Sequence, residues 1–258
     1  MKRWVNTGKK WLAVLFLVFL LVIWEMLARF YEVPVYILPM PSVIAEALFA
    51  SRNLLLFHTQ ATMTAALSGL ALAVVLAVVI AYLMNSVKVV KDMLYPLLVI
   101  SQTIPIIAIA PVMIIWFGFG YLPKILTVVL VCFFPMTVNI TEGLRNVDRE
   151  NTELLQTLGA GSLQIFRHNQ LPSVLPFFFS GLRISVTYSV MASVIGEWLG
   201  GNKGLGVFMI RSMHTYNTAA LFAAIVVVVM ISMLLFIVTN SIARQVMPWE
   251  KVEGEIVQ

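Results

Sequence analysis

Few side chains in this sequence have the types and the spacing that catalysis would need. The three histidines, His58, His168 and His214, fall in or beside expected loops, and the single cysteine, Cys132, lies within an apolar run. An enzyme working inside a membrane would need a Ser/His pair, paired aspartates or a metal cluster at membrane depth. The apolar segments contain no aspartate. The sequence therefore predicts no catalytic residues, no metal site and no cofactor held by this chain.

Polar side chains do occur deep within two apolar stretches. Residues 94–118 contain two of these polar residues and residues 174–198 contain five. They are Gln102, Thr103, Arg183, Ser185, Tyr188, Ser189 and Glu197. Polar groups at membrane depth are costly unless they face protein or a water-filled cavity. We expect these seven residues to line a substrate pathway. Two alternatives stay open, because small hydroxyls also mediate helix packing and Arg183 could extend to the cytoplasmic surface.

The composition requires a membrane protein. Hydrophobic residues make up 60% of the 258 residues and charged residues only 11%, with a mean hydropathy of +0.95. A soluble domain carries about 25% charged residues, so this excess must face lipid. No Lys/Arg run is interleaved with aromatic residues in the manner of a nucleic-acid-binding surface. We expect an all-α integral membrane protein with the lipid bilayer as its surroundings and no nucleic-acid partner.

Six apolar segments are long enough to cross the bilayer, which takes roughly 20 residues in a helix. The predicted spans cover residues 11–28, 61–84, 94–118, 122–140, 174–198 and 219–242. The first run is read as an uncleaved span because it is long and lacks a small-residue cleavage site. Eleven Lys and Arg residues fall on one side and five on the other, with one inside a span. Because cytoplasmic loops are enriched in these residues, residues 1–10 and the tail 243–258 are predicted to be cytoplasmic, around a transmembrane domain at 11–242.

Two segments on the opposite, outer side are more than simple connections. Residues 37–57 show apolar residues at helical spacing, and we expect an amphipathic helix at the outer surface with Ser42 as its N-cap. Residues 199–218 begin with several glycines, which favours a tight loop that includes an exposed His214. Glu25 and Glu197 are expected near the outer membrane boundary, with a role for Glu197 in gating or in binding a partner left open.

The cytoplasmic segment 141–172 reads as a helix, a sharp turn and a second helix. A helix is expected over 142–158, and Gly159 is expected to end it because glycine tolerates a positive φ. Ser162 is then expected to cap a short helix that contains Leu163 and Phe166, and Leu171-Pro172 to end it. From the residues alone, this segment is either a docking element for a cytoplasmic partner or an ordinary loop.

The spacing of four of these residues resembles a known motif. Glu153, Gly159, Leu171 and Pro172 match the EAA loop of binding-protein-dependent ABC importer permeases in type and in spacing. Three positions depart from it, because Leu154 and Leu155 replace two alanines and Asn169 replaces an apolar residue. The stretches IPIIAIAPVMIIWFGFG, FSGLRIS and GEWLGGNKGLG are similar to the nitrate, sulfonate and taurine branch, which includes importers of thiamine-pyrimidine precursors.

The resemblance implies a type I, MetI-like permease fold in a bacterial inner membrane. It implies three kinds of partner: a second permease copy in a homodimer, two cytoplasmic ATPase subunits that hold ATP and magnesium, and an extracytoplasmic binding protein. The implied substrate is a small polar or anionic solute. The implied ATPase-coupling residues are Glu153, Gly159, Ser162, Leu163, Phe166, Leu171 and Pro172. The sequence agrees in having no ATP-binding P-loop. The alternative is a secondary transporter or channel that works without an ATPase.

Overall fold

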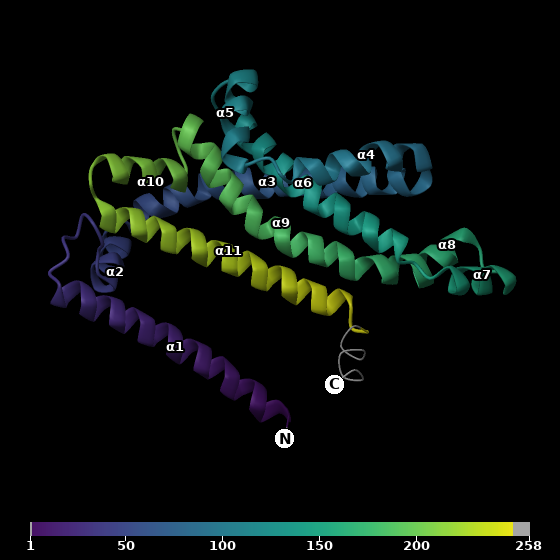
Figure 1. Ribbon diagram of the computed structural model, residues 1–258, viewed down its shortest axis with the longest axis horizontal. Helices are drawn as coiled ribbons and strands as arrows, with labels where there is room; N and C mark the ends of the chain where they lie inside the picture. Colours follow the sequence, from purple (N-terminus) through teal and green to yellow (C-terminus); the bar gives the residue numbers. More distant parts are fainter. Residues whose placement is uncertain (1, 250–258) are drawn as a thin grey trace.

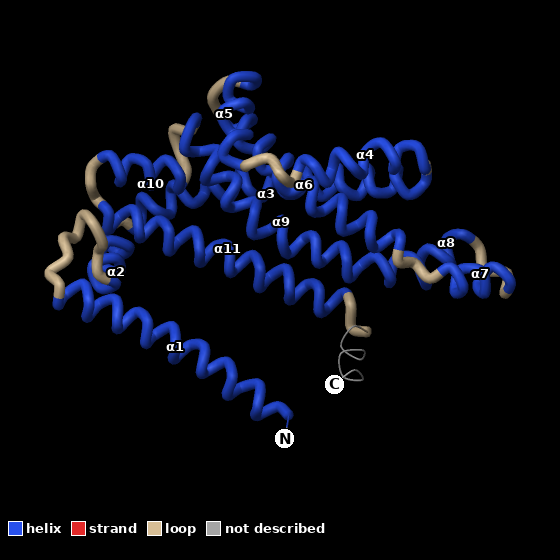
Figure 2. The backbone as a smooth tube through the Cα atoms, viewed as in Figure 1, coloured by secondary structure: helices blue, strands red, loops and turns tan. Residues whose placement is uncertain are grey.

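The computed structural model of the chain describes residues 2–249, with the side chains of residues 2–10, 13 and 200 left aside. Throughout this range the regular structure is helical, as Figure 2 shows. The predicted all-α class is therefore confirmed. Residues 250–258 of the predicted C-terminal tail lie outside the described residues.

Four helical stretches are long and apolar enough to cross a membrane. They are α3 (Arg52–Ser86), α6 (Tyr121–Arg145), the stretch Ser162–Leu199 that includes α9 (Leu171–Gly200), and α11 (Thr218–Val246). These four contain the predicted spans 61–84, 122–140, 174–198 and 219–242. The predicted span 11–28 lies within α1 (Lys2–Phe30), which is not among the four. The six-span topology therefore stays a prediction.

The predicted span 94–118 is wrong as a single helix. It consists of α4 (Lys88–Ser101) and α5 (Ile106–Phe117), which meet at an angle of 107°, so the pair forms either one broken span or a re-entrant loop. Figure 1 shows α5 directed away from the line of α4. Pro105 explains the break, since proline has no amide to donate and disfavours a helical conformation in the residue before it. Gln102 and Thr103 lie in the non-helical turn that results.

The centre of the molecule is built from α3, α6 and α9, with α11 packed along α9 (Figure 1). One face of α3 carries small residues that are fully buried, including Ala65, Ala66, Ala73, Ala77 and Ala81. Gly69 continues this face and lies so close to Val128 of α6 that a Cβ there would overlap it. Small side chains allow membrane helices to approach closely and to gain van der Waals packing. The three helices therefore form a firm frame for any site between them.

The outer segments differ from their predictions. The expected helix 37–57 is shorter, because α2 (Pro41–Ala50) ends before Ser51 and the later residues already belong to α3. Ser42 is not the N-cap, which is Met40. Instead the Ser42 amide and hydroxyl both donate to the carboxylate of Glu25, at 3.0 and 2.8 Å, so a side chain from α1 caps α2. The predicted loop 199–218 contains a helix, α10 (Leu205–His214), with an exposed His214 as its last residue.

Candidate functional site

The segment that was predicted to be cytoplasmic, 141–172, contains a helix that is separate from the long helix before it. The expected continuous helix 142–158 is wrong, because α6 ends at Arg145 and α7 spans Arg149–Thr157. Asp148 caps α7, since its carboxylate accepts hydrogen bonds from the amides of Glu150 at 2.8 Å and Asn151 at 3.3 Å. An aspartate at this position satisfies amides that have no partner within the helix.

Gly159 ends α7 as predicted. Its φ is +83°, a conformation that residues with a Cβ adopt only at a cost. The Gly159 amide donates to the Gln156 carbonyl and the Ala160 amide donates to the Leu155 carbonyl, both at 2.9 Å. This pair of bonds is the Schellman arrangement that closes a helix C-terminus. A Cβ at Gly159 would meet no atom within 4 Å, so the backbone conformation alone demands glycine here.

The second half of the segment does not stop where the sequence suggested. Helix α8 (Ser162–Ile165) continues through a π-helical turn, η1 (Phe166–Gln170), directly into α9. Pro172 has no amide, and the Leu171 amide bonds to the Phe166 carbonyl five residues earlier, so the wider π turn carries the helix past the proline. Ser162 is not the cap of α8. The N-cap is Gly161, whose amide donates to Oε1 of Gln164 at 2.9 Å.

Asn169 joins the two halves of the segment. Its side-chain amide donates to the Thr152 hydroxyl at 2.7 Å and to the Asp148 carbonyl at 3.0 Å, both at the start of α7. Asn169 is only 7% exposed. A position where the sequence departs from the EAA pattern is therefore an internal brace, and it does not face outward to a partner. We refer to residues 149–170, held together in this way, as the cytoplasmic element.

The outer surface of the cytoplasmic element carries apolar side chains. Leu158 is 74% exposed and Leu163 is 77% exposed, and Leu154 and Glu153 are exposed as well. Phe166, one helical turn after Leu163, lines a groove to which α3 and α9 also contribute. Exposed apolar side chains that gather at one end of a protein are typical of an interaction surface. Of these two predicted coupling residues, Leu163 is the more exposed, whereas Phe166 contributes to the groove wall.

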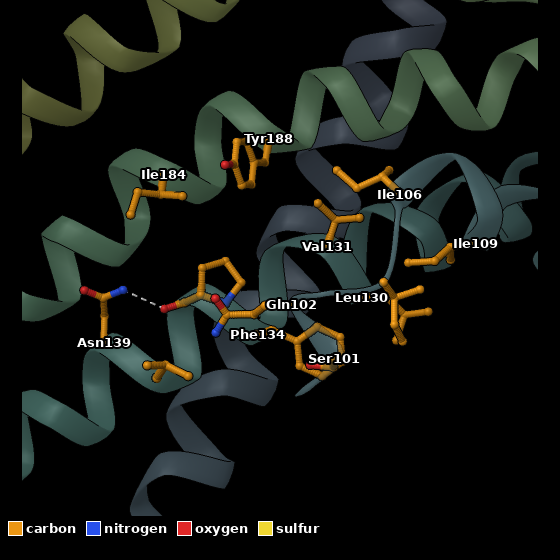
Figure 3. Close-up of a pocket in the computed structure, with 13 residues that line it drawn as sticks. Ser101, Gln102, Ile106, Ile109, Leu130, Val131, Phe134, Asn139, Ile184 and Tyr188 are labelled. Carbon is orange, nitrogen blue, oxygen red and sulfur yellow. Dashed lines mark hydrogen bonds between the residues drawn. The ribbon is translucent and has the colours of Figure 1, made fainter. Parts of the chain in front are cut away.

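A cavity of about 310 Å³ opens at the break between α4 and α5, and α6 and α9 complete its walls (Figure 3). Of the seven predicted pathway residues, Gln102 and Tyr188 line it. Ser101 and Asn139 add two further polar groups, and the Asn139 side-chain amide donates to the Pro135 carbonyl at 2.8 Å. Sequence reasoning missed Asn139, although a carboxamide inside the predicted span 122–140 was an available signal.

The structure does not bring four of the other candidates to this cavity. Thr103 donates to the Ile100 carbonyl and Ser189 to the Val186 carbonyl, so each hydroxyl is satisfied by its own segment. Ser185 donates to the Cys132 carbonyl at 3.1 Å and thereby ties α9 to α6. Arg183 does not line the cavity, and its Nε donates to Oδ1 of Asn240 in α11 at 2.7 Å.

Glu197, the seventh candidate, is buried within the protein and does not line the cavity. It is 1% exposed, and its carboxylate accepts hydrogen bonds from the Thr62 hydroxyl at 3.1 Å and from the Gly206 amide at 2.9 Å. Thr62 in turn accepts the Leu205 amide at 2.8 Å. Glu197 therefore fastens the start of α10 to both α3 and α9.

The glycine-rich loop before α10 is shaped by the same network. Gly204 has a φ of +130°, its amide donates to Nδ1 of His58 at 3.0 Å, and a Cβ there would overlap the Glu197 carboxylate. Lys124 of α6 donates to the Lys203 carbonyl at 3.0 Å. His58 and Lys124 are both buried, and His58 lies within α3, so its expected place in or beside a loop was wrong. We call Thr62, Glu197 and the backbone of 203–206 the outer network.

The arrangement of helices defines a class of membrane protein. A chain in a structure of the MetNI methionine ABC transporter superposes with a TM-score of 0.62 at 19% identity, over 72% of this chain and 93% of that one. A chain of an amino acid ABC transporter gives 0.58 at 16% identity, over 78% and 95%. These similarities show that the chain shares the helical fold of those two chains.

The sequence narrows this class to a family. Residues 69–251 match the family described as the binding-protein-dependent transport system inner membrane component, and the chain belongs to that family. It is 40% identical to the formylaminopyrimidine transport permease protein ThiX of Halalkalibacterium halodurans, over 92% of this chain and 95% of that protein. It is 32% identical to the riboflavin transport system permease protein RibX of Chloroflexus aurantiacus, over 91% and 88%. Identity to the taurine transport system permease protein TauC of Escherichia coli is 28%, over 98% and 94%. The chain is thus a multi-pass permease subunit of an ABC importer, as the EAA-like spacing predicted.

Proposed function

We propose that this permease passes a neutral, nitrogen-rich heterocycle of the thiamine-pyrimidine precursor class. The observation that carries the proposal is the chemistry of the cavity at the α4–α5 break. Its polar lining consists of two carboxamides, a phenol and a hydroxyl, and none of the thirteen described residues that line it is charged.

Carboxamides suit such a substrate better than they suit an anion. Gln102 and Asn139 each offer donors and an acceptor, which match the alternating nitrogen and amino groups at the edge of an aminopyrimidine. The Tyr188 ring adds an aromatic face with a polar tip. A sulfonate or nitrate buried among apolar residues would need a cation to offset its lost hydration. The nearby cation Arg183 is instead bonded to Asn240.

The relatives support this choice. The formylaminopyrimidine permease is 40% identical to this chain, whereas the taurine permease is 28% identical. The solved neighbours bear only on the fold. The cavity and the comparison with relatives thus both favour a thiamine-pyrimidine precursor over a sulfonate or nitrate.

The remaining parts of the importer are also proposed. Two ATPase subunits that hold ATP and magnesium bind the exposed face of the cytoplasmic element, which includes Glu153, Leu158 and Leu163. A substrate-binding protein docks at the opposite end, on α10 and the loop held by the outer network. A second copy of the chain completes the pathway in a homodimer with six spans per copy and cytoplasmic termini, in a bacterial inner membrane. The unbroken stretch Ser162–Leu199 supports this scheme, because motion at α8 passes along one continuous helix.

Reconstituted vesicles test the substrate assignment. The chain, its ATPase and its binding protein are reconstituted together, and ATP-dependent uptake of labelled formylaminopyrimidine, taurine and nitrate is compared. Formylaminopyrimidine should be taken up, and Gln102→Leu should reduce that uptake about tenfold or more, because it removes one bidentate polar partner. Equal or faster uptake of taurine would contradict the proposal.

A further inference from the structure

An apolar groove lies beside the junction of η1 and α9. It has a volume of about 600 Å³ and runs between α3, α6 and α9, with Val79, Leu83, Val174 and Phe178 among its walls. Apart from the tips of Tyr82 and Gln170, its lining is hydrocarbon. An open, apolar groove on a membrane protein fits a hydrocarbon chain, since the chain gains van der Waals contacts with the groove walls.

A basic cleft adjoins this groove. The cleft has a volume of about 970 Å³ and shares Leu144 and Gln170 with the groove, so the two hollows meet. Four cations line it, namely Lys88, Lys91, Arg145 and Arg149, against two acids, Asp92 and Glu153. The net charge of these six residues is +2, from four positive and two negative groups. Within the described side chains the single salt bridge joins Arg29 and Glu25, so no carboxylate lies within 4 Å of these four cations.

We propose that the groove and the cleft together bind one anionic phospholipid of the cytoplasmic leaflet. An acyl chain fills the groove and the headgroup phosphate lies among Lys88, Lys91, Arg145 and Arg149. Basic pockets at the cytoplasmic ends of transmembrane helices attract anionic headgroups in this way. Tyr82 lines the groove and is largely exposed, as expected for an amphipathic ring at the level where hydrocarbon gives way to headgroups.

The position of Phe166 connects the proposed lipid site to the cytoplasmic element. Phe166 belongs to η1, yet it forms part of the groove wall together with Val79 of α3. Thr152 and Glu153 of α7 line the adjoining cleft. A bound lipid therefore touches both halves of the cytoplasmic element and joins them to α3. The site is independent of the substrate that the permease carries.

Native mass spectrometry on the full-length chain provides the test. The chain is presented with equal amounts of phosphatidylglycerol and phosphatidylcholine that carry the same acyl chains. Phosphatidylglycerol should be retained at least tenfold more strongly. The double variant Lys88→Gln/Lys91→Gln should lose this preference by roughly tenfold or more, since each cation near a headgroup contributes severalfold to binding. The matched double variant Arg52→Gln/Arg211→Gln, which removes the same charge from the other end of the protein, should bind as the parent does.

A second pair of variants tests the groove. Val79→Trp fills it and should reduce binding of both lipids, whereas Val229→Trp on the exposed face of α11 should not. Inorganic phosphate should not compete, because it has no chain to fill the groove. Equal retention of both lipids by the parent chain, or an unchanged preference in Lys88→Gln/Lys91→Gln, would overturn the proposal. The proposal would also be overturned if added ATPase displaced the lipid and Lys91→Cys formed cross-links to that ATPase. The cleft would then be a docking surface for a protein.

Discussion

The side-chain amide of Asn169 donates to the hydroxyl of Thr152 at 2.7 Å, across 17 residues of sequence. This bond, with a second one to the Asp148 carbonyl, holds α7 against the helix that continues into α9. The cytoplasmic element is therefore a braced unit, and a force applied to α7 is carried into the membrane by the brace as well as by the chain.

Replacing Asn169 with leucine should weaken this unit, even though an apolar residue is what the EAA pattern expects there. The substitution removes both hydrogen bonds that the Asn169 side chain donates, and each such bond contributes about 0.5–1.5 kcal/mol to stability. Thermal unfolding in detergent should occur at a lower temperature and uptake should fall. Asn53→Leu, at an exposed position in the first turn of α3, is the control and should change stability by less than about 0.5 kcal/mol. Equal stability of the two variants would show that Asn169 is not a brace.

Gly159 should tolerate asparagine far better than valine. Both side chains meet open space, so the difference arises from the φ of +83°, which costs a β-branched residue about 1–2 kcal/mol and asparagine less. Gly159→Val should therefore reduce both the amount of ATPase that co-purifies and the rate of uptake, with Gly159→Asn close to the parent. Normal ATPase binding and normal uptake in Gly159→Val would show that ATPase docking does not depend on the turn that Gly159 closes.

The cavity residue Gln102 should be reached by water-soluble reagents. In a Cys132→Ala background, Gln102→Cys should react with a small thiol reagent, and substrate should slow that reaction because it occupies the same space. Thr103→Cys lies one residue away but does not line the cavity, so substrate should leave its reaction rate unchanged. Complete protection of Gln102→Cys in every transport state would count against the cavity as part of the pathway.

The outer network should make Gly204 sensitive to the smallest substitution. An added Cβ would overlap the Glu197 carboxylate and would also have to adopt a φ of +130°, so Gly204→Ala should destabilise the protein by about 2 kcal/mol or more. Gly161→Ala is the matched control, because its Cβ would come no closer than 3.9 Å to a neighbour. Limited proteolysis of the loop before α10 should become faster in Gly204→Ala alone. Equal cleavage rates in the two variants would contradict the role given to the network.

The sequence was most informative where local chemistry decides the structure. Apolar runs located α3, α6, α9 and α11, because hydrocarbon requires a long helix whose backbone is satisfied internally. Gly159 was predictable for a similar reason, since a glycine after a helical pattern marks a left-handed C-terminus. These features depend on neighbours in the chain and on the solvent.

Features that depend on distant partners were missed. The burial of Glu197 follows from Thr62, which lies 135 residues earlier, and no local pattern indicates that pairing. Asn169 departs from the EAA pattern, and its burial depends on α7, which begins 20 residues earlier in the chain and packs against it. The break after Ser101 was only partly visible in the sequence, because Pro105 interrupts the helical pattern but the apolar run around it still suggested a single span.

Photo-cross-linking from position 163 tests the central claim most directly. Leu163 is among the most exposed apolar side chains of the cytoplasmic element, and in this account it faces the ATPase. A photoreactive amino acid at this position, in the chain expressed with its ATPase and binding protein, should yield a cross-link to the ATPase subunit, and one at position 203 in the outer loop should not. A cross-link from position 163 to lipid or to the permease alone, in a complex that still transports, would contradict the assignment of this surface to ATPase coupling.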